Sequence, residues 1–250
     1  MAENDSPSQS PEEGASFLRS ADPLMVVGGQ AVNLWALHYQ ERVADLAPFV
    51  SRDVDILGDR ATLEAIARNV REKPRYFPIK PPSNAVGMVL ARGTGGQPLL
   101  IEVLRYVHGA SNDELRGSEY VFEIGPAAIP VRVPGPVALL KAKVANTADF
   151  RQKGRQDERH VRILVRVLPA YWRDLIGAVE SGEMAERNLI GQLEAAFRIV
   201  QSKKGKTVLT RLGILGTEVF AGLERSDLPK VQRFLEKRLS RLGNRRVDPA

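Results

Sequence analysis

Residues 53–57 read Asp-Val-Asp-Ile-Leu, a run that alternates carboxylates with apolar side chains. Alternation with a period of two is typical of a β-strand that has one polar and one apolar face. Upstream, residues 24–27 form a short apolar run that ends at Gly28 and Gly29. Residues 30–41 then carry apolar side chains at the spacing of a helix. These segments together predict a strand, a glycine turn, a helix and a second strand.

The rest of the chain extends this pattern into an α/β protein. Gly58 turns the chain, and Asp59 is placed to cap a helix over residues 61–71. Alternating apolar runs predict further strands at 85–91, 99–104, 120–124 and 129–133, with the Gly-Thr-Gly-Gly of 93–96 as a hairpin turn. Helical spacing predicts helices at 137–147, 156–180, 183–201, 208–223 and 227–242. We therefore expect an α/β (α+β) fold, a mixed sheet with flanking helices followed by a helical C-terminal region.

Composition limits the class of protein. The chain has 250 residues, of which 43% are hydrophobic, which is enough for a sizeable core. It has no cysteine, which excludes disulfides, thiolate nucleophiles and cysteine-bound zinc. No run approaches the roughly 20 apolar residues of a membrane helix, and the start of the chain lacks the order of a signal peptide. We therefore expect a cytoplasmic protein without a membrane partner.

Charge and local composition indicate how the chain is divided. The net charge is +6, with the basic segments in the second half, which suits either a polyanionic partner or a solvated basic surface. Residues 1–20 are rich in Ser, Pro and Glu, and they are expected to form a flexible tail. We expect a sheet-centred domain over residues 21–134 and a helical domain over residues 135–250. The oligomeric state is not predicted.

Three features could carry chemistry. Gly28 and Gly29 would let a phosphate approach the backbone, or they form only a tight turn. Asp53 and Asp55 lie two apart on a strand, so both project from one face about 6.6 Å apart, where a divalent cation would relieve their repulsion. Glu102 is a single charge inside the apolar run of 100–104, and it could complete a three-carboxylate site. The alternative for all three acids is a solvated strand face.

These motifs, in this order, resemble the DNA polymerase beta-like nucleotidyltransferases. The matching segments are Val-Gly-Gly-Gln-Ala-Val-Asn-Leu-Trp-Ala at 27–36, Ser-Arg-Asp-Val-Asp-Ile-Leu at 51–57 and an acid on a later strand. The sequence is most similar to the AbiEii-type nucleotidyltransferase toxins, whose lysine helix resembles residues 139–146 and whose basic-acidic segment resembles residues 153–160. The likeness covers roughly residues 24–165, and it would make residues 21–134 the catalytic domain.

The resemblance implies a role for each site residue. Asp53, Asp55 and Glu102 would bind Mg²⁺ or Mn²⁺ and carry the catalysis, and a nucleoside monophosphate would pass from an NTP to an acceptor in RNA, a protein or a small molecule. Gly28 and Gly29 would meet the triphosphate. Lys141 and Lys143 compete for the family's catalytic lysine position, and Val-Ala-Asn at 144–146 favours Lys143. Lys141 and Asp157 would then be nucleotide-binding residues, with Asp157 orienting Lys143 or another cation.

An antitoxin protein would be a partner if the chain is the toxin of a toxin–antitoxin pair. Two other classes of function also stay open. The chain could instead be a catalytically inactive member of the fold that binds nucleotide, nucleic acid or a protein partner, or a basic nucleic-acid-binding protein whose helical half does the binding. His38, His108 and His160 are too scattered for a zinc site. His160 is expected to be a surface or helix-packing residue.

Overall fold

The fold is built on one mixed β-sheet. The computed structural model describes residues 10–20, 22–78, 83–92, 98–239 and 242. Within them the strands are β1 Met25–Val27, β2 Asp53–Leu57, β3 Arg75–Tyr76, β4 Ala85–Arg92, β5 Pro98–Leu104, β6 Glu119–Ile124 and β7 Ile129–Pro134. Their order is β3-β4-β5-β2-β1-β7-β6, with β2 parallel to β5, β1 parallel to β7 and the other pairs antiparallel. The predicted α/β class with a mixed sheet is confirmed.

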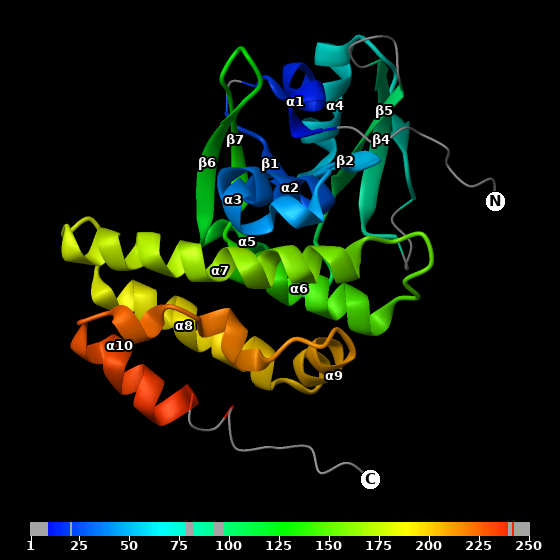
Figure 1. The fold of residues 1–250 in the computed structure, drawn as a ribbon. Helices are drawn as coiled ribbons and strands as arrows, with labels where there is room; N and C mark the ends of the chain where they lie inside the picture. Colours follow the sequence, from blue (N-terminus) through cyan, green and yellow to red (C-terminus); the bar gives the residue numbers. More distant parts are fainter. Residues whose placement is uncertain (1–9, 21, 79–82, 93–97, 240–241, 243–250) are drawn as a thin grey trace.

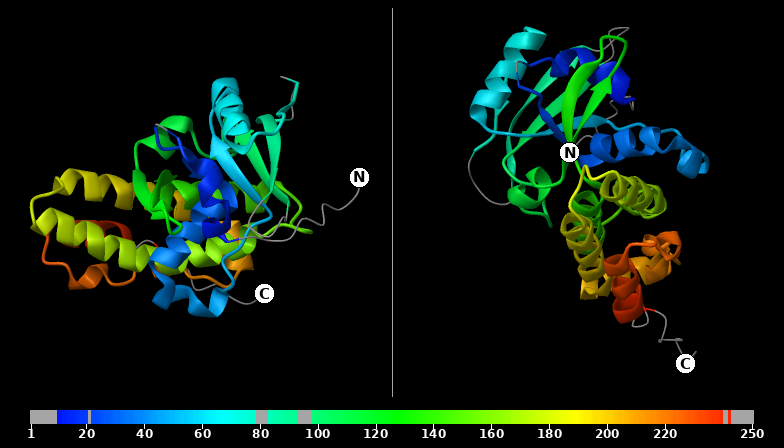
Figure 2. Two further views of the ribbon diagram at one scale, coloured as in Figure 1. Left: turned by 90° about the horizontal axis from the view of Figure 1, so that it is seen from above. Right: turned by 90° about the vertical axis from the view of Figure 1, so that its left-hand side faces the viewer.

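Helices cover the sheet and then form a layer of their own. They are α1 Pro11–Gly14, α2 Gly28–His38, α3 Gln40–Val43, α4 Arg60–Val70, α5 Asn112–Arg116, α6 Pro136–Asp149, α7 Asp157–Glu180, α8 Glu186–Gln201, α9 Lys203–Arg211 and α10 Pro229–Phe234. Short 3-10 turns are η1 Ala15–Leu18, η2 Ala44–Leu46, η4 Gly216–Phe220 and η5 Leu223–Arg225, and α10 continues as a π-helical turn, Leu235–Leu239. Figure 1 shows α7 crossing one end of the sheet, with α8, α9 and α10 beyond it. The right-hand view of Figure 2 shows the same arrangement, with the sheet at the top and the last helices at the bottom.

One hydrophobic core joins the sheet to the helices. Trp35 on α2 is 1% exposed, and its ring contacts Tyr120 on β6 and Tyr171 on α7 edge to face. The indole N–H of Trp35 donates a hydrogen bond of 2.8 Å to the carbonyl of Pro134, the last residue of β7. The sheet-centred part and the helical part therefore share buried side chains across the predicted division at residues 134 and 135.

Most of the predicted elements are present. All six predicted strands form, and Asp59 caps α4 by accepting from the backbone N–H of Thr62 at 2.9 Å. The long helices α6, α7 and α8 cover the predicted segments to within a few residues. The hairpin turn predicted at 93–96 lies outside the described residues. Within the described residues, no helix is long and apolar enough to cross a membrane.

Two of the predicted helices differ from the structure. The helix expected over 208–223 is wrong, because α9 ends at Arg211 and Gly213 takes a positive φ of 67°, which breaks the helical path. The helix expected over 227–242 starts only at Pro229, the favoured residue type at a first helical position, and changes to a π-helical turn after Phe234.

The tail expected over residues 1–20 is wrong for its second half. Residues 11–18 form α1 and η1, and the side chains of Ala15 and Leu18 lie in the core at 3% and 2% exposure. Two apolar side chains in a polar segment suffice to dock it on the sheet. Residues 1–9 lie outside the described part of the chain.

Candidate functional site

The turn between β1 and α2 strongly favours glycine. Gly28 has a φ of +68°, a conformation that side chains with a β-carbon rarely adopt. Gly28 is the first residue of α2, an 11-residue helix whose N-cap residue, Val27, makes no side-chain cap. The first backbone N–H groups of a helix have no acceptor within the helix. This turn therefore presents backbone donors that the helix itself does not use, at the positive end of the helix dipole.

The carboxylates of β2 are aimed at this turn. Val54 and Ile56 face the main core, so Asp53 and Asp55 project from the opposite face of the strand. A β-carbon on Gly28 would lie only 1.8 Å from Oδ2 of Asp55, so the carboxylate occupies the space that the missing side chain leaves. The predicted approach of the aspartate strand to the glycine turn is thus present in the structure.

Glu102 lies beside Asp55 on the neighbouring strand. β2 and β5 run parallel, and their register pairs Asp55 with Glu102 and Asp53 with Leu100. Paired positions on neighbouring strands are about 4.8 Å apart and face the same side. The three acids predicted from the sequence therefore share one face of two adjacent central strands.

These acids repel one another. Burial, followed by the charge of Asp53, raises the pKa of the Asp55 carboxyl well above its ordinary value, and Glu102 adds to the effect. Burial and the charge of Asp53 also raise the pKa of Glu102. Among the described residues, neither Asp55 nor Glu102 has a hydrogen-bond or ion-pair partner, whereas Asp53 accepts a hydrogen bond of 3.1 Å from the hydroxyl of Ser51. Lys143 and Arg155 offset only part of this negative charge, because both lower the pKa of Asp55 and it nevertheless stays raised.

The three carboxylates are chemically suitable ligands for a cation that binds oxygen atoms. Mg²⁺ prefers carboxylate oxygens and often binds through only one or two of them together with substrate phosphates. Asp53, Asp55 and Glu102 supply such oxygens on one face. In the part of the chain that the structure describes, no three His, Asp or Glu side chains converge into a ready-made coordination shell. Binding of a cation would therefore have to draw these side chains together.

A buried ion pair closes the helical side of the site. Nζ of Lys143 on α6 lies 3.0 Å from Oδ1 of Asp157, and these side chains are 8% and 3% exposed. Nε of Arg155 lies 2.6 Å from Oδ2 of Asp157. Burial alone would raise the pKa of Asp157, but Lys143 and Arg155 together hold it below its ordinary value. The charge of Lys143 also acts on Asp55, where it lowers the pKa, so this lysine is electrostatically coupled to the carboxylate cluster.

Lys141 is not brought to this site. It is 42% exposed, and Nζ lies 2.5 Å from Oε1 of Glu114 on α5. Residues two apart on a helix point to nearly opposite sides, and only Lys143 points toward Asp157. Lys141 and Glu114 instead line a cavity of about 1350 Å³ between α6 and α8. The two lysines therefore lie on different sides of α6, Lys143 paired with Asp157 and Lys141 with Glu114.

Two neighbours of Gly29 were not predicted as site residues. A β-carbon on Gly29 would lie 2.8 Å from Oγ of Ser51 and 3.2 Å from Cε1 of His160. Of the two alternatives expected for His160, a surface or a helix-packing residue, the first is wrong, because the residue is 5% exposed on α7. The helical spacing of this segment could have indicated its burial, because His160 lies three residues after Asp157 on the buried side of α7.

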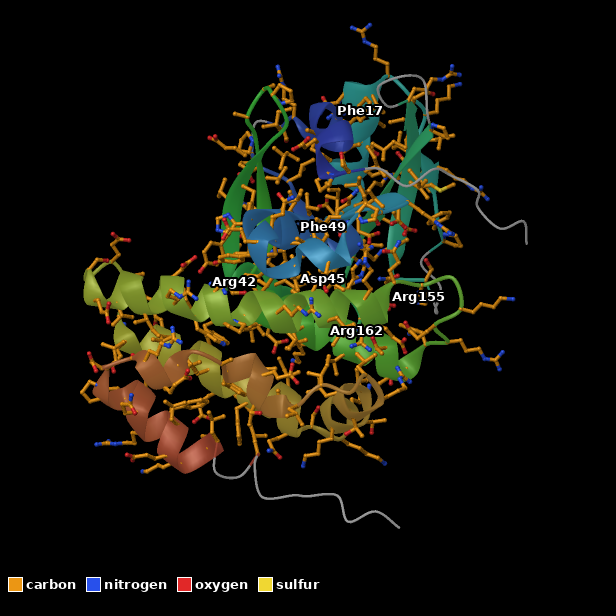
Figure 3. The ribbon with its side chains drawn as sticks, in the orientation of Figure 1. Phe17, Arg42, Asp45, Phe49, Arg155 and Arg162 are labelled. Carbon is orange, nitrogen blue, oxygen red and sulfur yellow. The ribbon has the colours of Figure 1, made fainter. Side chains whose placement is uncertain are left out.

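Arginines border the site along the start of α7. Figure 3 shows Arg155 near the N-terminal end of this helix and Arg162 further along it. Arg159, between them in sequence, donates from Nε to the carbonyl of Leu46 at 3.1 Å. Arg155 and Arg162 are exposed, so this end of α7 presents positive charge to solvent beside the buried pair of Lys143 and Asp157.

Comparisons with known proteins add one finding. No protein-family model matches the sequence, and no curated protein is significantly similar to it. Among solved structures, the chain is similar to an antigenic nucleotidyltransferase-like protein from Paracoccidioides brasiliensis. The two share 14% sequence identity and a TM-score of 0.42 over 91% of this chain and 95% of the other.

Proposed function

We propose that this protein is a metal-dependent nucleotidyltransferase, which moves a nucleoside monophosphate from an NTP to an acceptor in RNA, a protein or a small molecule. The observation that carries the proposal is the position of Asp55, which touches the Gly28 turn and lies beside Glu102 on the neighbouring strand. A glycine turn at a helix N-terminus favours phosphate. Carboxylates next to it favour a divalent cation that the phosphate would share.

Each of the site residues has a separate role in the proposed reaction. The N–H groups that follow Gly28 would hold the triphosphate, and the ammonium of Lys143 would offset its charge. Asp157 positions Lys143 through their buried ion pair. Asp53, Asp55 and Glu102 would hold Mg²⁺ or Mn²⁺, which when bound supplies Lewis-acid polarisation of phosphoryl oxygens.

The transfer itself is a displacement at the α-phosphorus. The acceptor oxygen forms a bond to that phosphorus while the bond to the pyrophosphate leaving group breaks. Glu102 would accept the proton of the acceptor hydroxyl, a task for which a carboxyl with a raised pKa is suited.

Labelling with α-³²P-NTPs tests this function. The purified protein would be incubated with each labelled NTP, Mg²⁺ or Mn²⁺, and total RNA or total protein from cells. We expect label on one acceptor class, loss of at least about 100-fold with Asp53→Asn or Glu102→Gln, and no loss with Glu123→Gln. Glu123 is an exposed strand carboxylate on β6 and serves as the matched control. Equal labelling by Asp53→Asn and the unchanged protein would refute the proposal.

The toxin role is a further part of the proposal. It rests on the resemblance to AbiEii-type proteins, and an antitoxin would be the corresponding partner. Induced expression should arrest growth of a bacterial host, and Asp53→Asn should not. Growth arrest by both forms would separate any toxicity from nucleotidyl transfer.

A catalytically inactive nucleotide-binding protein is the second candidate. It is favoured by the absence of three converging metal-ligand side chains in the described part of the chain. This candidate predicts that NTP binds with Mg²⁺ and that no label is transferred to any acceptor. Calorimetry together with the labelling assay separates the two candidates.

A further inference from the structure

His160 on α7 is a buried polar side chain whose two ring nitrogens have no partner. The residue is 5% exposed, and within the described part of the chain neither Nδ1 nor Nε2 has a hydrogen bond. Buried polar groups in proteins are nearly always hydrogen-bonded, so such a group needs an explanation. A phenylalanine would fill the same space without leaving two polar atoms unsatisfied. Packing alone therefore does not account for a histidine here.

The imidazole lies at the N-terminus of α2. Its Cε1, the atom between the two nitrogens, is 3.2 Å from the point where a β-carbon on Gly29 would lie. Gly29 is the second residue of α2, and no side chain caps that helix end. The unpartnered nitrogens of His160 and the first backbone groups of α2 are therefore next to each other.

Cations outnumber anions around this histidine. Burial, followed by the charge of Lys143, lowers the pKa of His160 well below its ordinary value, with Arg159 and Arg155 acting in the same direction and Asp157 opposing them. At neutral pH the ring is therefore uncharged, with one N–H donor and one acceptor nitrogen. Its surroundings favour an anion, and the ring can contribute a hydrogen bond without a further buried charge.

We propose that His160 donates its ring N–H to a phosphate oxygen of a triphosphate bound at the Gly28–Gly29 turn. The inference rests on the proposed nucleotide-binding function and adds a ligand-contacting residue to it. His160 would act beside the backbone donors of α2 next to Gly29, whereas Asp55 lies against Gly28. A triphosphate is the expected ligand because three of the four charged groups that act on the ring are cations, and the fourth, Asp157, is already paired with Lys143 and Arg155.

Calorimetric binding of inorganic tripolyphosphate and of each NTP, with Mg²⁺, tests the assignment. His160→Phe should weaken binding of both by about 10-fold or more, the effect of losing a hydrogen bond to a charged group. The same variant should keep or raise the melting temperature, because it removes two unsatisfied polar atoms. His160→Gln and His160→Asn place an amide N–H near the Nε2 and Nδ1 positions, and one of them should recover most of the affinity. His38→Phe changes an exposed histidine and should leave binding unaltered.

Each outcome has a distinct meaning. Unchanged affinity of His160→Phe would overturn the assignment, as would an unmodified protein that binds no triphosphate. A loss of affinity that occurs for NTPs but not for tripolyphosphate would also overturn it, since the contact would then be to the nucleoside. If the unmodified protein binds triphosphate but labels no acceptor, the transfer function fails while the role of His160 stands.

Discussion

A β-carbon on Gly28 would lie 1.8 Å from Oδ2 of Asp55, so the turn before α2 and the carboxylate on β2 occupy one shared space. The register explains this contact, because β1 and β2 are antiparallel and Asp55 pairs with Val27, the residue before Gly28. Backbone conformation, sheet register and the position of the carboxylate are therefore coupled. A change at either residue should affect the other.

Gly28→Ala should destabilise the fold and displace Asp55. The φ of +68° costs an alanine about 1–2 kcal/mol, and the contact with Oδ2 of Asp55 adds to that cost because one of the two atoms must move. Gly213→Ala is the matched control, since Gly213 has a φ of +67° and nothing lies within 4 Å of its added β-carbon. Chemical denaturation should show a larger loss for Gly28→Ala. Equal losses would mean that Asp55 moves aside without cost.

Asp55→Asn should stabilise the protein at neutral pH while it removes nucleotidyl transfer. The pKa of Asp55 is raised in the folded state by burial and by the charge of Asp53. A carboxyl with a raised pKa favours folding below its unfolded pKa of about 4 and loses that contribution as pH rises through the folded value. The variant should therefore gain roughly 0.5–2 kcal/mol at pH 7, in the range usual for stabilising changes.

Denaturation at two pH values tests the predicted stabilisation by Asp55→Asn. Denaturation of the unmodified protein and Asp55→Asn at pH 4 and pH 7 should give curves that differ more at pH 7. A difference that grows toward pH 4 would contradict the sign of the shift, and a destabilised variant at pH 7 would show that the charge of Asp55 is compensated in solution.

Local sequence was sufficient to predict the elements that build the site. The alternation in Asp53–Leu57 specified a strand with its carboxylates on one face, and Gly28 marked the turn. The pairing of Asp55 with Glu102 depends on β2 and β5 being adjacent, although β3 and β4 lie between them in sequence. The sequence showed that Glu102 was an unusual charge in an apolar run, but only the topology places it beside Asp55.

Other features depended on tertiary contacts that no local pattern contains. Lys141 and Lys143 have similar neighbours in sequence, and they differ because Glu114 lies on one side of α6 and Asp157 on the other. His160 was expected to be either a surface or a helix-packing residue, and it is the packing of α7 against α2 that buries it. Leu18 was assigned to a tail because its segment is polar, whereas Leu18 and Ala15 are both buried in the core.

Magnesium should raise the melting temperature, and protons should compete with it. At a concentration 100 times the dissociation constant, binding would stabilise the fold by about 2.7 kcal/mol. Since the pKa values of Asp55 and Glu102 are both raised, the shift in melting temperature should be larger at pH 8 than at pH 5.5. Removal of the metal with EDTA should reverse the shift, and Asp53→Asn should show little of it. A shift that is equal at both pH values would indicate binding away from these carboxylates.

The two lysines of α6 provide the sharpest comparison. Lys143→Ala leaves the carboxylate of Asp157 buried with only Arg155 as a charged partner, and loss of one member of a buried pair costs about 3–5 kcal/mol. Lys141→Ala breaks an exposed pair with Glu114 and should cost about 0–1 kcal/mol.

Measurements in acid and on a double variant distinguish loss of the Lys143–Asp157 ion pair from loss of side-chain packing. The pKa of Asp157 is lowered in the folded state, so its contribution to stability is present at neutral pH and is lost as pH falls through the folded value. The cost of Lys143→Ala should therefore shrink in acid, while that of Lys141→Ala should change little. Asp157→Asn combined with Lys143→Ala should cost less than the sum of the single changes, because the partners form one unit. Additive costs that do not vary with pH would show that Lys143 contributes mainly through its aliphatic stem, and Asp157 would then have no role in positioning it.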